Sequence, residues 1–291
     1  MEQPQKKFNF IFFGTSYFSV IILDELKVAG FTPTLVVTVP DKPKGRALVM
    51  TSPETKVWAE THNVPCVQFG TLKNAESETE IKKYFPDGCD VGVVASYGNI
   101  IPQNILDIPR RGMLNVHPSL LPKLRGASPL QSAILSEHET GVTIMHLDAQ
   151  MDHGGIVAQE KIAIHDWPPY ALDLEELLGH AGGKLLAEVL PRWIAGTATE
   201  TVQNHTEATF TKKIEKADAK LDLSAPMEVN LRKIRAYHVW PGAYFFHTHK
   251  SGKKIRVIVT RAHVENGILT IERVIPEGKK EMNYSDFLRG N

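Results

Sequence analysis

The sequence predicts an α/β protein with a doubly wound, mostly parallel sheet, followed by a smaller β domain. Residues 8–13 form an apolar run, apolar residues then recur at helical spacing up to Gly30, and a second β-rich run covers 34–39. Strands joined through a helix in this way pair in parallel. Residues 89–96 are almost continuously apolar, as in a central strand buried on both faces. The length of 291 residues fits about two domains.

The rest of the chain continues this alternation and then changes character. We expect helices near 56–59, 76–84, 130–135 and 172–193, and strands near 64–67, 113–116, 142–147 and 156–164. A polar stretch at 197–211 has the composition of a linker. Strands near 253–259 and 267–274 and a short helix at 284–288 follow it. We therefore predict domains 1–204 and 205–291.

Composition excludes several classes of protein. The 33 basic and 33 acidic side chains leave no net charge to draw the chain to nucleic acid or membrane, so any such partner must meet a local patch. Cys66 and Cys89 are the only cysteines and form no Cys-x-x-Cys pair, which argues against disulfides and structural zinc. A reducing cytoplasm is the expected compartment. No apolar run is long enough to span a bilayer.

The first strand ends in a single glycine, Gly14, without the G-x-G-x-x-G pattern of dinucleotide sites. A tight strand-to-helix turn is therefore the better interpretation of Gly14. The loop after the central strand, beginning Ser96-Tyr97-Gly98, leaves the carboxyl end of the sheet, where open α/β folds bind ligands. We expect this loop to form one wall of a pocket.

Two polar residues alternate on a β-like segment in the middle of the chain. Asn115 and His117 lie two positions apart, so on a strand they point to one face, where an amide and an imidazole can hold the same substrate oxygen. Asp152 can join them from a second stretch. Each residue alone also has an ordinary structural explanation, as a turn residue or a hydrogen-bonded buried histidine. The residues by themselves leave both interpretations open.

A basic, turn-rich loop lies at 40–46, with Lys42, Lys44 and Arg46 close together. Three cations in a loop can meet a phosphate backbone, and they can equally belong to a solvated surface. Charge alone does not decide between these interpretations.

With these pieces placed, the chain resembles the folate-dependent formyltransferase family from end to end. The most specific part is the combination of N-x-H and S-L-L-P at 115–122 with D-x-G-G at 152–155. Further matches are Phe13-Gly14-Thr15, the loop 40–46, Ser96-Tyr97-Gly98, Arg125-Gly126-Ala127 and Gly141-Val142-Thr143-Ile144. The segments 208–210, 235–236, 240–241 and 276–280 look like the signatures of members that act on methionyl-tRNA.

The resemblance implies transfer of the formyl group of 10-formyltetrahydrofolate to the α-amino group of initiator methionyl-tRNA. It implies a Rossmann-like catalytic domain and an OB-like C-terminal domain. We also expect a monomer with no membrane partner, and no metal, because proton transfer and oxyanion stabilisation suffice for this reaction. It carries over a catalytic triad and two binding sets. The catalytic residues are Asn115, His117 and Asp152; the folate-binding residues are Ser96, Tyr97, Gly98, Ile100, Ser119, Leu120, Leu121 and Pro122; the tRNA-binding residues are Lys42, Lys44 and Arg46.

The C-terminal domain departs from the family pattern, because only Val264-Glu265-Asn266 separates two predicted strands. We therefore expect a shortened OB-like domain. Two alternatives follow. A shortened domain argues mildly for a family member that formylates an amino-sugar nucleotide with the same folate donor. From another class, the chain is a noncatalytic module that binds tRNA or folate.

Overall fold

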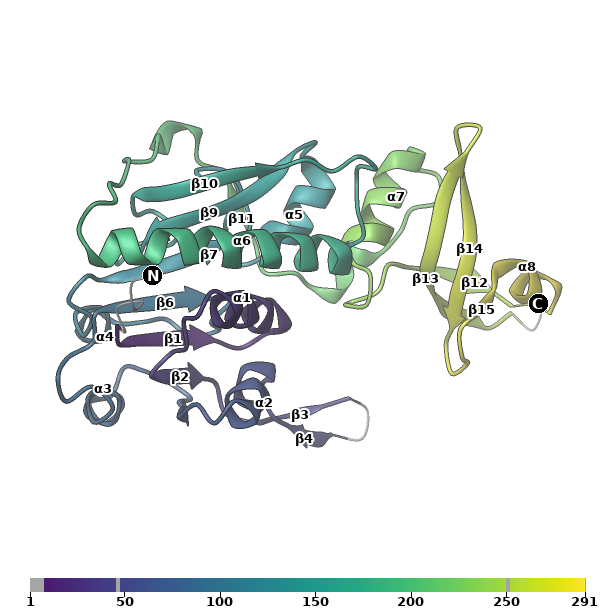
Figure 1. Cartoon of the computed structure of the whole chain (residues 1–291). Coiled ribbons are helices and arrows are strands. Elements are labelled where there is room, and N and C mark those ends of the chain that lie inside the picture. The colour runs from purple at the N-terminus through teal and green to yellow at the C-terminus, as the bar shows by residue number, and fades with distance from the viewer. Residues whose placement is uncertain (1–7, 46–47, 250–251, 291) are drawn as a thin grey trace. The chain divides into compact units, whose positions relative to one another are not determined.

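In the computed structural model, which describes residues 8–45, 48–249 and 252–290, seven strands form one sheet in the order β10-β9-β7-β6-β1-β2-β5 (Figure 1). The pairs β1–β2, β1–β6, β2–β5 and β6–β7 are parallel, and β7–β9 is antiparallel. The strands are β1 (Phe10–Gly14), β2 (Leu35–Thr38), β5 (Cys66–Gln68), β6 (Val91–Ala95), β7 (Met113–His117), β9 (Thr140–His146) and β10 (Ile156–Ile162). The predicted α/β class is confirmed.

Helices cover both faces of this sheet. They are α1 (Tyr17–Val28), α2 (Glu54–Thr61), α3 (Ala75–Lys82), α4 (Gln103–Leu106) and α6 (Ala171–Ile194). The helix α5 (Pro129–Ser136) belongs to a second compact unit. Figure 1 shows α1 beside α6, and a Cβ on Gly179 or Gly183 of α6 would lie within 3.0 Å of Ile21 or Glu25 of α1. The glycines of α6 therefore allow the two helices to approach closely.

The opposite face carries the core that leads to the candidate site. Ile11 and Phe13 of β1, Val94 of β6 and Met113 of β7 are buried there with side chains from α3 and α4. Asn115 and His117 follow Met113 at intervals of two along β7, so they share its face at the carboxyl end of the strand. Core packing of Met113 thus fixes the side of the sheet to which the polar pair belongs.

The basic loop is a β-hairpin, which the sequence did not predict. β3 (Lys42–Lys44) pairs antiparallel with β4 (Val49–Thr51), and Lys42 lies opposite Thr51. All six residues of the two strands are exposed. A fully exposed hairpin that contains proline and lysine lacks the apolar alternation by which strands are recognised.

Four strands form the C-terminal sheet, as far as the structure describes the chain, in the order β12-β13-β14-β15 and with antiparallel pairing throughout. They are β12 (Tyr244–Thr248), β13 (Lys254–Glu265), β14 (Ile268–Pro276) and β15 (Met282–Asn283), and the helices are α7 (Met227–Ala236) and α8 (Tyr284–Arg289). The turn between β13 and β14 is even shorter than predicted. It consists of Asn266 and Gly267, both at positive φ (51° and 77°), as in a two-residue hairpin turn.

Packing divides the chain into two compact units that alternate along the sequence. The first comprises 1–125, 141–162 and 176–209, and the second comprises 126–140, 163–175 and 210–291. Short pieces complete the secondary structure: β8 (Arg125–Gly126), β11 (Phe210–Thr211) and the 3₁₀ turns η1 (His205–Glu207) and η2 (Lys216–Ala219). The domain boundary between residues 204 and 205 stays a prediction.

Candidate active site

Short hydroxyl hydrogen bonds tie together the strand ends at the candidate site. Ser19 Oγ donates to the Ala95 carbonyl (2.7 Å), and Ser16 Oγ donates to Ser96 Oγ (2.8 Å). Gly14 permits this approach, because a Cβ there would lie 2.7 Å from the Cβ of Ser19. The tight strand-to-helix turn predicted at Gly14 is therefore confirmed, and it holds the end of β1 against the end of β6.

β7 carries two of the three predicted catalytic residues. Asn115 lies opposite Val94 of β6 and Met145 of β9, and His117 lies opposite Thr143 of β9. Because β7 pairs with β6 on one side and with β9 on the other, the backbone that carries the Asn115 and His117 side chains is fixed. His117 is only 4% exposed, whereas Asn115 is half-buried.

The third predicted residue, Asp152, faces His117. Asp152 Oδ1 lies 3.7 Å from His117 Nδ1, which is an ion-pair distance rather than a direct hydrogen bond. His117 Nε2 lies 3.1 Å from the carbonyl oxygen of Leu124. A carbonyl only accepts, so Nε2 carries the proton in that bond and the neutral ring presents an unprotonated Nδ1 towards Asp152.

The backbone of Asp152 is in the left-handed region, with φ of 50°. Residues other than glycine adopt this conformation seldom, and surrounding contacts must hold them there. Gly154 is part of what holds it, since a Cβ at Gly154 would lie 1.8 Å from the carbonyl oxygen of His146. The D-x-G-G stretch therefore packs against the end of β9 in a way that only glycine allows.

Hydrogen bonds from a buried threonine fix the loop after β7. Thr143 Oγ1 donates to the Ser119 carbonyl (2.7 Å) and accepts from the Leu121 amide (3.2 Å). Gln159 Nε2 donates to Thr143 Oγ1 (2.8 Å) and to the Leu121 carbonyl (3.0 Å). The hydroxyl of Thr143 thus makes three hydrogen bonds, which is its full capacity.

This loop supplies four of the residues predicted to bind folate, and they differ in orientation. The Ser119 and Leu121 side chains are buried, and Ser119 Oγ donates to the Lys123 carbonyl (2.7 Å). Leu120 and Pro122 remain partly exposed, and the Leu121–Pro122 peptide bond is cis. Leu120 and Pro122 are therefore the members of this set whose side chains can reach a ligand.

The other predicted folate residues follow β6. Ser96 and Gly98 are exposed, as is Ile100 at 71%, whereas Tyr97 is half-buried and packs edge-on against Phe13 with ring centroids 5.4 Å apart. Burial raises the pKa of Tyr97, which keeps its hydroxyl protonated at neutral pH. The loop therefore combines a half-buried phenol with an accessible apolar side chain, Ile100.

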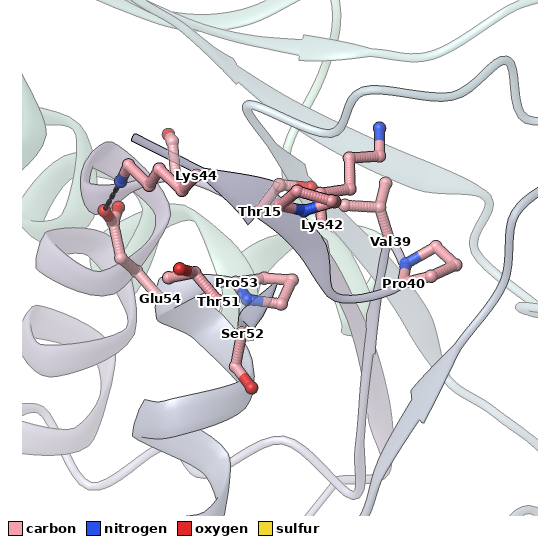
Figure 2. Close-up of a pocket in the computed structure, with 11 residues that line it drawn as sticks. Thr15, Val39, Pro40, Lys42, Lys44, Thr51, Ser52, Pro53 and Glu54 are labelled. Atoms are coloured by element: carbon pink, nitrogen blue, oxygen red, sulfur yellow. Dashed lines mark ion pairs between the residues drawn. The ribbon is translucent and has the colours of Figure 1, made fainter. Parts of the chain in front are cut away.

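A surface pocket of about 300 Å³ lies beside the β3–β4 hairpin (Figure 2). Lys42 and Lys44 line it, and Figure 2 shows Lys44 turned towards Glu54, with Lys44 Nζ 3.7 Å from Glu54 Oε1. Both side chains of this ion pair are highly exposed, so the pair contributes little stability. The third predicted tRNA-binding residue, Arg46, lies outside the described residues.

Asp41 anchors the start of the hairpin. Its carboxylate accepts hydrogen bonds from Gln68 Nε2 (2.7 Å), Lys56 Nζ (3.1 Å) and Ser52 Oγ (3.1 Å). These bonds, with the one from Gln68 first, lower the pKa of Asp41. At the other end of the hairpin Leu48, Val49 and Met50 are each more than 60% exposed, so the hairpin presents an apolar surface beside its two lysines.

The structure also brings to the site a glutamine that sequence reasoning missed. Gln203 lies in the stretch assigned to a linker, yet it is 4% exposed and hydrogen-bonded to the main chain of Asp152 and to Arg125. The stretch is pinned at Thr201 too, which exchanges two 2.8 Å backbone hydrogen bonds with Ile156. A single glutamine in a polar stretch has no periodicity, so nothing in the sequence marked it.

Within the ranges described, no cluster of three or more His, Cys, Asp or Glu side chains has the arrangement of a metal site. In the same part of the chain, every helix is too short or too polar to cross a membrane.

Two family matches cover most of the chain. Residues 6–190 match the family described as formyl transferase, and residues 213–267 match the formyl transferase C-terminal domain. The matches follow one another in the order of the two predicted domains.

Relatives that match most of the chain carry a narrower name. A methionyl-tRNA formyltransferase of Chloroflexus aggregans (strain MD-66 / DSM 9485) is 45% identical over 239 residues, covering 81% of this chain and 75% of the relative. A methionyl-tRNA formyltransferase of Geobacillus sp. (strain WCH70) is 36% identical over 301 residues, covering 96% and 93%. The likeness thus includes the C-terminal part.

Solved structures share the fold at low sequence identity. The methionyl-tRNA formyltransferase from Clostridium thermocellum has a TM-score of 0.59 at 19% identity, covering 93% of this chain and 99% of the other. A sugar N-formyltransferase from Shewanella sp FDAARGOS_354 has a TM-score of 0.64 at 17% identity, covering 89% and 99%. At this identity the two likenesses describe the fold and do not distinguish between acceptors.

Proposed function

Because the chain belongs to the formyl transferase family, we propose that it transfers the formyl group of 10-formyltetrahydrofolate to the α-amino group of initiator methionyl-tRNA, the step that prepares this tRNA for translation initiation. The observation that carries the proposal is the arrangement of Asn115, His117 and Asp152 at the carboxyl edge of the sheet. Members of this family use folate-derived formyl donors, and the 10-formyl form is part of the proposal.

The reaction needs one proton transfer and one stabilised oxygen. The acceptor amine attacks the formyl carbon, the bond from that carbon to N10 of the folate breaks, and one proton passes from the attacking nitrogen to the departing one. His117 Nδ1 is suited to take this proton, since Nε2 is engaged with Leu124. Asp152, 3.7 Å from Nδ1, stabilises the imidazolium that results.

Asn115 supplies the second requirement. Its amide shares a strand face with His117 and donates to the oxygen that becomes anionic in the tetrahedral intermediate. One such donor contributes about 3 kcal/mol to transition-state stabilisation. The folate ring, which is flat and largely apolar, suits the accessible Ile100 tip and the exposed backbone at Gly98.

The hairpin is the proposed contact for the tRNA end, with Lys42 and Lys44 near phosphates and the apolar strand β4 near bases. Lys42→Ala should weaken tRNA binding and reduce the slope of log affinity against log salt by about 1. Lys44→Ala is the matched comparison: Glu54 already opposes this charge, so we expect a smaller change in slope. Equal slopes in wild type and Lys42→Ala, measured by filter binding, would contradict a phosphate contact at Lys42.

The amino-sugar alternative loses support from the relatives. Sequences 45% and 36% identical to this chain are named methionyl-tRNA formyltransferases. The shortened β13–β14 connection favoured that alternative. This chain nevertheless matches the methionyl-tRNA formyltransferase of Geobacillus over 93% of the relative's length. A cytoplasmic location and a monomeric state remain predictions.

The test offers the purified chain 10-formyltetrahydrofolate with methionyl-tRNA or with a 4-amino-sugar nucleotide. We expect formylation of methionyl-tRNA alone. The product is measured by deacylating the tRNA and separating formylmethionine from methionine. His117→Ala should lower turnover at least 100-fold without unfolding, because it removes the proton acceptor. Formylation of the sugar nucleotide instead would overturn the proposed acceptor, and near-normal turnover in His117→Ala would overturn the proposed site. Binding of tRNA with no formylation would support the noncatalytic module.

A further inference from the structure

One buried side chain in the first compact unit uses all of its hydrogen-bonding capacity beside the candidate site. Gln203 Oε1 accepts from Arg125 Nε (3.1 Å) and Nη2 (2.6 Å). Its Nε2 donates to the carbonyl oxygens of Asp152 (2.9 Å) and Gly154 (2.7 Å). A side-chain amide has two donors and two acceptor positions, and here all four are occupied. The orientation of the amide is therefore determined by its partners.

The acceptor side of this amide is held by a buried cation. Arg125 is 3% exposed, and its Nη2 also lies 2.9 Å from His205 Nδ1. A guanidinium only donates, so Nδ1 of His205 accepts this hydrogen bond and carries no proton. Partial loss of solvent around the exposed ring, then the neighbouring His153 and Arg125, lower the pKa of His205, which is consistent with the neutral form. His205 also stacks on His153, with ring centroids 4.1 Å apart.

The donor side ends on the loop that carries Asp152. The two carbonyls that Gln203 binds flank His153, whose Nδ1 lies 2.7 Å from Asp148 Oδ2. The backbone of Asp152 is in the left-handed region, a conformation that costs free energy for a residue with a side chain and that contacts from outside the loop help to hold. Two hydrogen bonds from the Gln203 amide, whose oxygen is held by charge-assisted bonds from Arg125, supply this restraint.

Resting on the proposed function, we propose that Gln203, clamped by Arg125, is a positioning residue that holds the Asp152 carboxylate against His117. Gln203 touches neither the formyl group nor the imidazole. It acts through the backbone of residues 152–154, and a displacement of the carboxylate by about 1 Å is enough to reduce turnover about 100-fold.

The first test observes positioning without any acceptor. Imidazole carbon and nitrogen resonances of His117 are compared by NMR in wild type, Asp152→Asn and Gln203→Ala. We expect the Gln203→Ala resonances to move towards those of Asp152→Asn, because both changes remove the carboxylate from Nδ1. Gln159→Ala is the matched control: this glutamine also binds a backbone carbonyl near the site, at Leu121, and should leave those resonances in place. Unmoved His117 resonances in Gln203→Ala would overturn the proposal.

The second test is kinetic. Gln203→Ala should lower kcat 10- to 100-fold and leave KM for both substrates within twofold. Gln159→Ala should instead raise KM for the folate, because this glutamine holds the loop at Leu121. In an Asp152→Asn background, Gln203→Ala should cost less than a further twofold in single-turnover rate, since the two residues act as one unit. If Gln203→Ala lowered the single-turnover rate in that background as much as it does in the wild type, the residue would have a general structural role and the proposal would be overturned.

A third variant covers the case in which Gln203→Ala does not fold. Gln203→Glu keeps the size and the two acceptor bonds to Arg125, and it replaces both donated bonds by carboxylate–carbonyl repulsion. We expect the same displaced His117 resonances and the same fall in kcat. Wild-type behaviour of this variant would overturn the proposal. If the wild-type chain formylates neither acceptor, the proposed function fails, while the NMR comparison still decides the position of Asp152.

Discussion

Replacing Thr143 by valine tests whether one hydroxyl holds the loop after β7. The two side chains have the same shape, so the change removes the Oγ1 atom and leaves the packing of this fully buried residue intact. Three groups lose a partner: the Ser119 carbonyl, the Leu121 amide and the Gln159 amide. At about 1 kcal/mol for each lost bond, the free energy of unfolding falls by about 3 kcal/mol. For a protein of 291 residues that corresponds to a decrease in Tm of roughly 5 °C.

The same strand provides a control. Thr140 is 2% exposed, and its hydroxyl has no hydrogen-bond partner among the described residues. Thr140→Val therefore removes a buried polar atom without breaking a bond, and Tm should stay the same or rise. Thermal unfolding followed by circular dichroism compares the two variants at one scan rate. Equal shifts in Thr140→Val and Thr143→Val would refute the reasoning, since the hydrogen bonds would then contribute nothing.

Three further predictions concern the site and the core. Asp152→Asn should reduce turnover at least 100-fold and leave folate affinity within threefold, as checked by single-turnover kinetics and fluorescence titration, because the imidazolium loses its counter-charge. Gly154→Ala should lower both Tm and turnover, since the new Cβ meets the His146 carbonyl at 1.8 Å; a wild-type melting curve would contradict this. Burial raises the pKa of Cys66 to about 11 and of Cys89 to about 12, so neither is a thiolate at pH 8 and a disulfide reagent should react only after unfolding. As pH rises above about 9, thiols of the unfolded chain ionise first, so stability should decrease.

Much of the sheet was predictable because its central strands β1, β2 and β6 are buried on both faces. The run at β6 and the opening β-α-β pattern depend on local composition, and the structure agrees with them to within a few residues. Asn115 and His117 could be paired from sequence because the period of a strand is two, which is a local property. Their closeness to Asp152 depends on a contact between distant segments, so it could be predicted only from the family resemblance.

Two features could not be predicted, for different physical reasons. The β3–β4 hairpin is fixed by bonds to Asp41 from Gln68 and Lys56, which are distant in sequence, rather than by an apolar face of its own. Gln203 lies 78 residues from Arg125, and its contribution depends on four hydrogen bonds that have no sequence signature. Buried polar contacts of this kind are specified by the completed fold and not by any segment of it.

The alternation of compact units along the chain limits how the protein can be divided into fragments. Within the second unit, Arg232 of α7 donates 2.8 Å hydrogen bonds to the carbonyls of Ile134 and Glu137 at the end of α5, although almost a hundred residues separate them. A fragment ending at residue 204 would keep α5 without the guanidinium that satisfies it, and the complementary fragment would keep a buried arginine without its acceptors. A truncation that removes α7 would therefore damage a helix in the first half of the chain, so the two parts of the second unit depend on each other.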